Sequence, residues 1–297
     1  MSKNTILRPA SADSAAVAQD VDEEVVSFPG DARTAEHRAR LYLLISLAFE
    51  RPGDDFAAAL ADNAFNEQLQ ESAAVLGGDL PAAAERVRDA LADREQHHGE
   101  WASLFGVEEG MTVSPYELRY LPGPLLTTIR KLADIRGFYN AYGLAITDGM
   151  NDRPDHICFL TEFLGYLANQ EAYLRRHEDD DGVRVVVETQ RSFLEDHLGR
   201  WYWRFAEEVA NQDTGTFYSA MADLLAALVE AEIDRLAIDP DWVPDDPAVL
   251  EWSADVFGDV GRGCGPCGMN PGEDEQLMEG MHPGHGHLIG DESPGSE

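Results

Sequence analysis

The apolar residues of this chain recur at helical spacing over most of its length. The clearest segment runs from Arg153 to Ala172 and is apolar over most of its circumference, which predicts a central helix. Asp152 is expected to cap this helix, with Pro154 in the first turn, where its missing N–H costs little. The period-two alternation that indicates a strand persists nowhere in the sequence. The chain is therefore predicted to be all-α.

Six further segments share the helical period: 34–49, 54–70, 81–105, 125–142, 183–211 and 216–237. Thr34 is expected to cap the first of them. Pro and Gly residues break residues 106–124, which are expected to form a long loop, and residues 144–152 are expected to form another. About seven helices joined by short loops predict a single helical-bundle domain over residues 33–240.

The two ends of the chain lack this period. Residues 1–32 are rich in Ala, Ser, Asp and Val, and residues 241–297 hold much of the Pro and Gly and end acidic. Segments of this composition bury too little apolar surface to offset the entropy of ordering. We expect both ends to be disordered acidic tails.

The chain is strongly acidic, with 56 Asp and Glu against 22 Lys and Arg, for a net charge of −34. Lys3 and Lys131 are the only lysines. Such a field repels nucleic acids and anionic membrane surfaces, which are poor partners for it. In molar salt the Debye length falls to about 3 Å, so self-repulsion is largely screened. The composition predicts a halophilic protein, and the alternative is an ordinary acidic protein.

Cysteine usage and hydropathy indicate the compartment. The chain has three cysteines, an odd count that does not describe a secreted disulfide scaffold. The N-terminus has no apolar segment typical of a secretory signal. No apolar run reaches the roughly 18 residues that spanning a bilayer requires. We expect a cytoplasmic protein without stable membrane insertion.

The C-terminal tail contains a possible metal site. A Cys-x2-Cys pair is followed after fourteen residues by a His-x2-His pair, which is close to the spacing of structural zinc sites. The candidate ligands are Cys264, Cys267, His282, His285 and His287. Few apolar residues surround them, so a flexible tail with incidental Cys and His is the other interpretation. This segment supports an alternative function, a small metal-binding protein or a metal-dependent enzyme.

Asp155 and His156 could form an acid–base pair at a helix start. Adjacent residues on a helix do not face each other, however, and no Ser or Cys nucleophile stands at a recognisable turn nearby. We therefore expect no catalytic residues and no enzyme. Aromatic residues crowd the last two predicted helices, where they are expected to be core: Phe193, Trp201, Tyr202, Trp203, Phe205, Phe217 and Tyr218.

Four short motifs occur in a fixed order along the chain. They are Trp101 to Phe105, Pro115-Tyr116-Glu117, Pro154-Asp155-His156-Ile157 and His197-Leu198-Gly199-Arg200-Trp201. In this order, on a chain already predicted to be all-α, they resemble the TorD/DmsD/NarJ family of maturation chaperones for molybdoenzymes. The similarity covers about residues 33–237, and the tails depart from the family.

The resemblance implies a non-catalytic chaperone that requires no cofactor. Family members bind the twin-arginine signal peptide, or another N-terminal segment, of a molybdopterin oxidoreductase catalytic subunit and support cofactor insertion before export or assembly. The peptide-binding residues carried over are Trp101, Leu104, Phe105, Tyr116, Glu117, Asp155 and His156. Aromatic and Leu side chains suit the apolar part of such a peptide. Glu117 and Asp155 are expected to receive its guanidinium groups.

Overall fold

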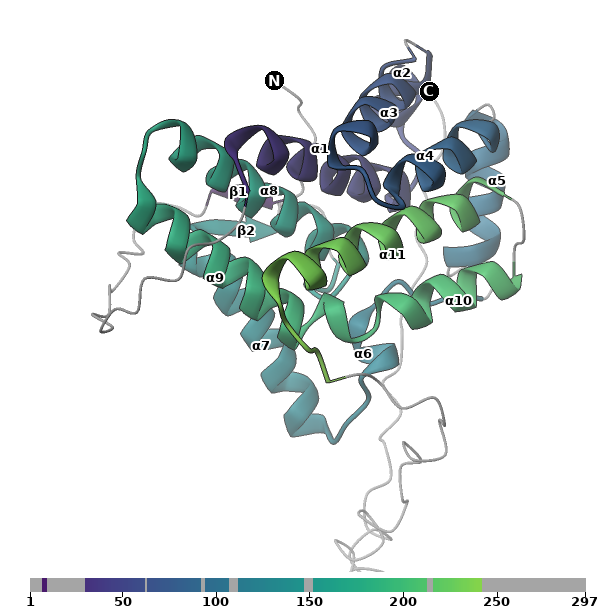
Figure 1. The fold of residues 1–297 in the computed structure, drawn as a ribbon. Coiled ribbons are helices and arrows are strands. Elements are labelled where there is room, and N and C mark those ends of the chain that lie inside the picture. Colours follow the sequence, from purple (N-terminus) through teal and green to yellow (C-terminus); the bar gives the residue numbers. More distant parts are fainter. Residues whose placement is uncertain are drawn as a thin grey trace, which may run out of the picture. The chain divides into compact units, whose positions relative to one another are not determined.

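The computed structural model describes residues 7–9, 30–61, 63–91, 94–106, 112–146, 152–212 and 216–241. Within these residues the fold is helical, as predicted (Figure 1). The predicted tails, 1–32 and 241–297, lie almost entirely outside the described residues, so their disorder stays a prediction. No helix in the described part is both long and apolar enough to cross a membrane.

Two long helices form the centre of the fold. They are α1 (Ala32–Phe49) and α8 (Ile157–Arg176), and their packing is the most extensive between any two elements. A Cβ atom at Gly165 would lie 3.0 Å from the Leu43 side chain and 3.2 Å from the Ala39 carbonyl oxygen, so glycine permits this close approach. Most apolar side chains of α8 are buried, with Tyr173 near its C-terminal end exposed, which confirms the predicted central helix.

The remaining helices surround this pair. Their bounds are α2 Asp54–Ala61, α3 Ala64–Leu76, α4 Leu80–Asp89, α5 Arg94–Phe105, α6 Glu117–Tyr120, α7 Leu125–Ala141, α9 Asp180–Asp196, α10 Tyr202–Gln212 and α11 Phe217–Leu236. Figure 1 shows α11 between α4 and α10, and it packs on both. The α3 helix packs on α1, and α9 packs on α8. The late aromatic residues lie in or against this core, as predicted.

Helix starts differ from the predicted ones. Asp31, and not Thr34, caps α1: its side chain accepts from the Thr34 N–H at 2.7 Å, and the Thr34 hydroxyl accepts from the Asp31 N–H. His156, and not Asp152, caps α8. The α8 helix begins four residues later than predicted because residues 153–156 turn toward another segment of the chain.

Three predicted helices are each divided in two. Residues 54–70 contain α2 and the start of α3, with Asn63 between them in the left-handed region at φ 54°. Residues 81–105 contain most of α4 and all of α5. Residues 183–211 contain most of α9, a 3-10 turn at Leu198–Arg200 (η2) and most of α10. A Cβ atom at Gly199 would overlap the Leu194 carbonyl oxygen, so this tight turn requires glycine.

The structure also contains elements that the sequence did not predict. Strands β1 (Leu7–Pro9) and β2 (Leu144–Ile146) pair antiparallel, with Leu7 opposite Ile146. Helix α6 lies inside the predicted loop 106–124. Elements of three or four residues are too short to carry a period, and these strands are defined by pairing between distant segments. The ribbon is small, so the all-α class stands.

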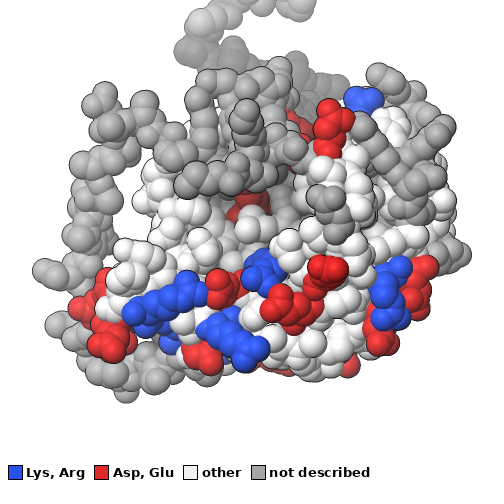
Figure 2. Space-filling model, turned by 90° about the horizontal axis from the view of Figure 1, so that it is seen from above, with Lys and Arg blue, Asp and Glu red and all other residues white. Residues whose placement is uncertain are grey.

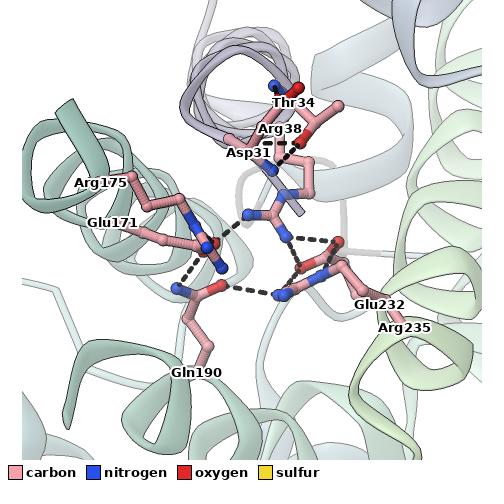
Figure 3. A network of polar contacts seen from close by, with 8 residues as sticks. All are labelled: Asp31, Thr34, Arg38, Glu171, Arg175, Gln190, Glu232 and Arg235. Carbon is pink, nitrogen blue, oxygen red and sulfur yellow. Dashed lines mark hydrogen bonds and ion pairs between the residues drawn. The ribbon is translucent and has the colours of Figure 1, made fainter. Parts of the chain in front are cut away.

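A buried ion network joins three helices (Figure 3). Arg38 on α1 lies 2.6 Å from Glu171 on α8 and 3.3 Å from Glu232 on α11, and all three side chains are at most 4% exposed. Arg175 and Arg235 complete the network with ion pairs of 2.8 Å to Glu171 and Glu232. Burial alone would raise the pKa of both glutamates, but the charges of Arg38 and Arg235 and the hydrogen bonds to the carboxylates together outweigh it, so both pKa values lie below their usual range.

Candidate functional site

The second and third motifs meet in a short antiparallel bridge between Tyr116 and His156. The Glu117 N–H donates to the Asp155 carbonyl at 3.0 Å, and the Ile157 N–H donates to the Pro115 carbonyl at 2.8 Å. The rings of Tyr116 and His156 are edge-on, with centroids 5.0 Å apart. Two segments forty residues apart in sequence therefore form one rigid backbone unit.

The two carboxylates of this unit point inward. Glu117 and Asp155 are both fully buried. Asp155 accepts from the Leu118 N–H at 3.1 Å and from Arg153 Nε at 2.9 Å. Glu117 Oε1 lies 3.0 Å from His197 Nδ1. Glu117 Oε2 has no hydrogen-bond partner, but both carboxylates are 0% exposed, so neither presents an oxygen at the surface to an incoming guanidinium group. Glu117 and Asp155 therefore lie beneath the surface, where they hold the backbone of the bridge in position. The sequence had predicted that they contact the peptide's guanidinium groups directly.

The fourth motif packs against the same unit. His197 is 2% exposed, and besides Glu117 it approaches Asp134 on α7, with His197 Nε2 3.3 Å from Asp134 Oδ2. The Trp201 ring stacks on Tyr120 of α6, with centroids 4.9 Å apart and planes 14° from parallel. The His-Leu-x-x-Trp motif therefore packs against the buried side of the second motif.

The first motif lies on α5 and is linked to the second through the residues before Tyr116. Trp101 is partly exposed, and its indole N–H donates to the Phe49 carbonyl at 2.9 Å. Phe105 and Leu104 are buried, at 4% and 3% exposure. The Leu104 carbonyl accepts from the Thr112 and Val113 N–H groups, so the segment before Tyr116 is tied to α5. A cavity of about 320 Å³ beside Leu104 is lined by Gly99, Glu100, Ser103, Leu104, Thr112 and Gln212.

The exposed part of this site is aromatic and polar. The Tyr116 hydroxyl donates to Asp152 Oδ1 at 2.8 Å, and the Arg153 guanidinium lies 4.7 Å from the centre of the Tyr116 ring. Burial raises the pKa of Tyr116, which keeps the hydroxyl a donor. Burial lowers the pKa of His156 to about 4, so its imidazole is neutral at pH 7. His156 Nδ1 accepts from the Cys158 N–H at 3.2 Å, which fixes the orientation of the ring.

These groups do not form a catalytic arrangement. Cys158 is buried, and burial raises the pKa of its thiol well above the usual value, which disfavours a reactive thiolate. Among the described residues, no group of three or more His, Cys, Asp or Glu side chains could hold a metal ion. The predicted zinc ligands Cys264, Cys267, His282, His285 and His287 lie outside the described residues, so zinc binding stays a prediction.

A family model described as the nitrate reductase delta subunit matches residues 58–207, about half of the chain. The chain belongs to this family. The matched range contains all four motifs, from Trp101 to Trp201. This result confirms the resemblance to the TorD/DmsD/NarJ chaperones.

Individual proteins similar to this chain are consistent with its membership of the family. This chain is 28% identical to the chaperone protein TorD of Aliivibrio fischeri over 126 residues. The aligned region covers 41% of this chain and 56% of that protein. It is 27% identical to TorD of Photobacterium profundum, over 66% of this chain and 93% of that protein. It is 30% identical to the chlorate reductase assembly chaperone protein of Ideonella dechloratans, over 51% of this chain and 76% of that protein. All three are named as chaperones and not as catalysts.

Proposed function

We propose that this chain is a cytoplasmic assembly chaperone for the catalytic subunit of a molybdopterin oxidoreductase. It binds the N-terminal segment of that subunit, a twin-arginine signal peptide, and supports cofactor insertion before export or assembly. Family membership and the names of the relatives support the general role. The burial of Glu117, Asp155 and the Cys158 thiol supports a role without catalysis.

The Tyr116–His156 bridge is the observation that carries this proposal. It places the partly exposed rings of Tyr116 and His156 on one backbone unit. The buried side chains of Glu117 and Asp155 hold this unit in position through their hydrogen bonds. Such a preorganised surface binds a flexible peptide without first having to order itself. In this proposal the rings of Trp101, Tyr116 and His156 contact the apolar part of the peptide.

The basic part of the peptide requires a different carboxylate from those first expected. Asp152 is partly exposed and lies beside the ring pair through its hydrogen bond with Tyr116. Its second oxygen is the group that we propose for a peptide guanidinium. Glu117 and Asp155 then contribute indirectly, by holding the bridge in place.

A binding measurement with a client signal peptide tests this surface. The double variant Tyr116→Ser/His156→Asn removes both rings, while Asn can still cap α8. We expect its affinity, measured by calorimetry or fluorescence anisotropy at constant salt, to fall by about tenfold to a hundredfold, since two aromatic contacts contribute roughly 1.5–3 kcal/mol.

The other end of α8 offers a matched control. Tyr173 and His177 also form a ring pair, with centroids 4.1 Å apart, and Tyr173 is 55% exposed. Tyr173→Ser/His177→Asn makes the same chemical change far from the site, so it should leave affinity unchanged. Equal affinities for wild type and both variants, with unchanged helix content, would place the peptide elsewhere.

A further inference from the structure

One face of α7 is apolar and exposed. Leu125, Leu126 and Ile129 are 62%, 71% and 53% exposed, and their positions fall on one side of the first turns of the helix. The buried residues of α7, Ile135 and Tyr139, lie toward its other end. Covering an exposed Leu or Ile completely contributes about 1.5–3 kcal/mol. Three such residues together form an uncovered face within the described part of the chain.

This face differs in charge from the chain as a whole. The α7 helix carries Arg130, Lys131 and Arg136 against Asp134, although the chain has a net charge of −34. Figure 2, which shows the molecule from above the view of Figure 1, shows basic side chains lying beside acidic ones. Arg130 and Arg136, by contrast, are exposed and form no ion pair with the described residues. A partner for this surface must therefore combine apolar and acidic side chains.

The chain itself carries such a segment in the sequence directly after its described part. The described part ends at Asp241, whose carbonyl accepts from Arg200 Nε at 2.9 Å. The nearby His197 places this end against α7, because its Nε2 lies 3.3 Å from Asp134 Oδ2 and its carbonyl accepts from the Arg200 N–H at 3.0 Å. Residues 242–250 follow, and they lie outside the described residues, so only their sequence is considered. It is Trp-Val-Pro-Asp-Asp-Pro-Ala-Val-Leu, which is both apolar and acidic.

The distances are compatible with a contact between this segment and α7. Nine residues span at most about 30 Å when extended. Asp134 and Leu125 are nine residues apart on α7, or about 14 Å along the helix axis. A segment attached to the same chain also acts at an effective concentration in the millimolar range, so even weak contacts are occupied.

We propose that the apolar face of α7 (Leu125, Leu126 and Ile129) binds residues 242–250 of its own chain. Trp242, Val249 and Leu250 cover the apolar side chains, and Asp245 and Asp246 pair with Arg130 and Arg136. This contact is independent of the peptide site at Tyr116 and His156.

Hydrogen exchange of the α7 amides, read by mass spectrometry in the full-length protein, tests this contact. Asp245→Lys/Asp246→Lys should make the amides of residues 126–134 exchange about tenfold faster at the same salt concentration. Adding Arg130→Glu/Arg136→Glu to this variant swaps both sets of charges and should restore most of the protection. Circular dichroism checks that each variant is folded.

A matched control changes the same number of charges elsewhere. Glu85 and Asp196 are exposed on α4 and α9, and Glu85→Lys/Asp196→Lys should leave exchange in α7 unchanged. Equal exchange in wild type and Asp245→Lys/Asp246→Lys would overturn the proposal. Protection that depends on protein concentration would overturn it too, because the occupant would then be a second copy of the chain.

Discussion

Among the described residues, Arg38 forms the side-chain ion pairs that connect the most distant parts of the chain. It lies on α1 and pairs with Glu171, 133 positions away, and with Glu232, 194 positions away. In the sequence it is one arginine among several on a helix, and nothing local distinguishes it from Arg40. Its importance arises because both glutamates are buried and depend on it for their charge balance.

We predict that Arg38→Met lowers the free energy of unfolding by about 3–5 kcal/mol, because it leaves two buried carboxylates without their shared partner. Arg40→Met is the control. Arg40 pairs at 2.9 Å with Glu71, but the two side chains are 29% and 61% exposed, so the loss should be below about 1 kcal/mol. Urea unfolding at constant salt measures both variants. Similar losses would show that burial does not set the strength of the Arg38 network.

At the scale of elements, the break between α9 and α10 depends on Gly199. We predict that Gly199→Ala destabilises the protein by about 1–3 kcal/mol or more, because its Cβ would meet the Leu194 carbonyl oxygen of the backbone. A Cβ atom at Gly137, in the exposed part of α7, would meet no atom within 4 Å, so Gly137→Ala should instead stabilise by up to about 1 kcal/mol. Thermal unfolding of the two variants should shift in opposite directions, and a neutral Gly199→Ala would mean that the turn has room to move.

At the scale of the whole molecule, the net charge of −34 dominates. We predict that the helical signal in far-ultraviolet circular dichroism is complete in molar KCl and is reduced, or loses cooperativity on heating, in dilute buffer. Repulsion between carboxylates extends about 10 Å at 0.1 M salt but only about 3 Å at 1 M. Full thermal stability in dilute buffer would refute the halophile hypothesis, and non-ionic sucrose is the control for a general solute effect.

The sequence alone determined the fold class, the family and the undivided long helices α1, α7, α8 and α11. Each of these depends on local information: a helical period repeated over many turns, or motifs in a fixed order. It also named Tyr116, Glu117, Asp155 and His156 as peptide-binding residues; the structure brings these four together, and their role in peptide binding stays a prediction.

Only the tertiary structure decided the rest. Whether a carboxylate faces solvent or the interior, as for Glu117 and Asp155, depends on residues that pack against it from elsewhere in the chain. The cap of α8, the break at Gly199, the β1–β2 pairing and the Arg38 network likewise arise from contacts between distant segments or from close approaches of the backbone. Such contacts leave no periodic signal in the sequence, because each is made once, between partners that only folding brings together.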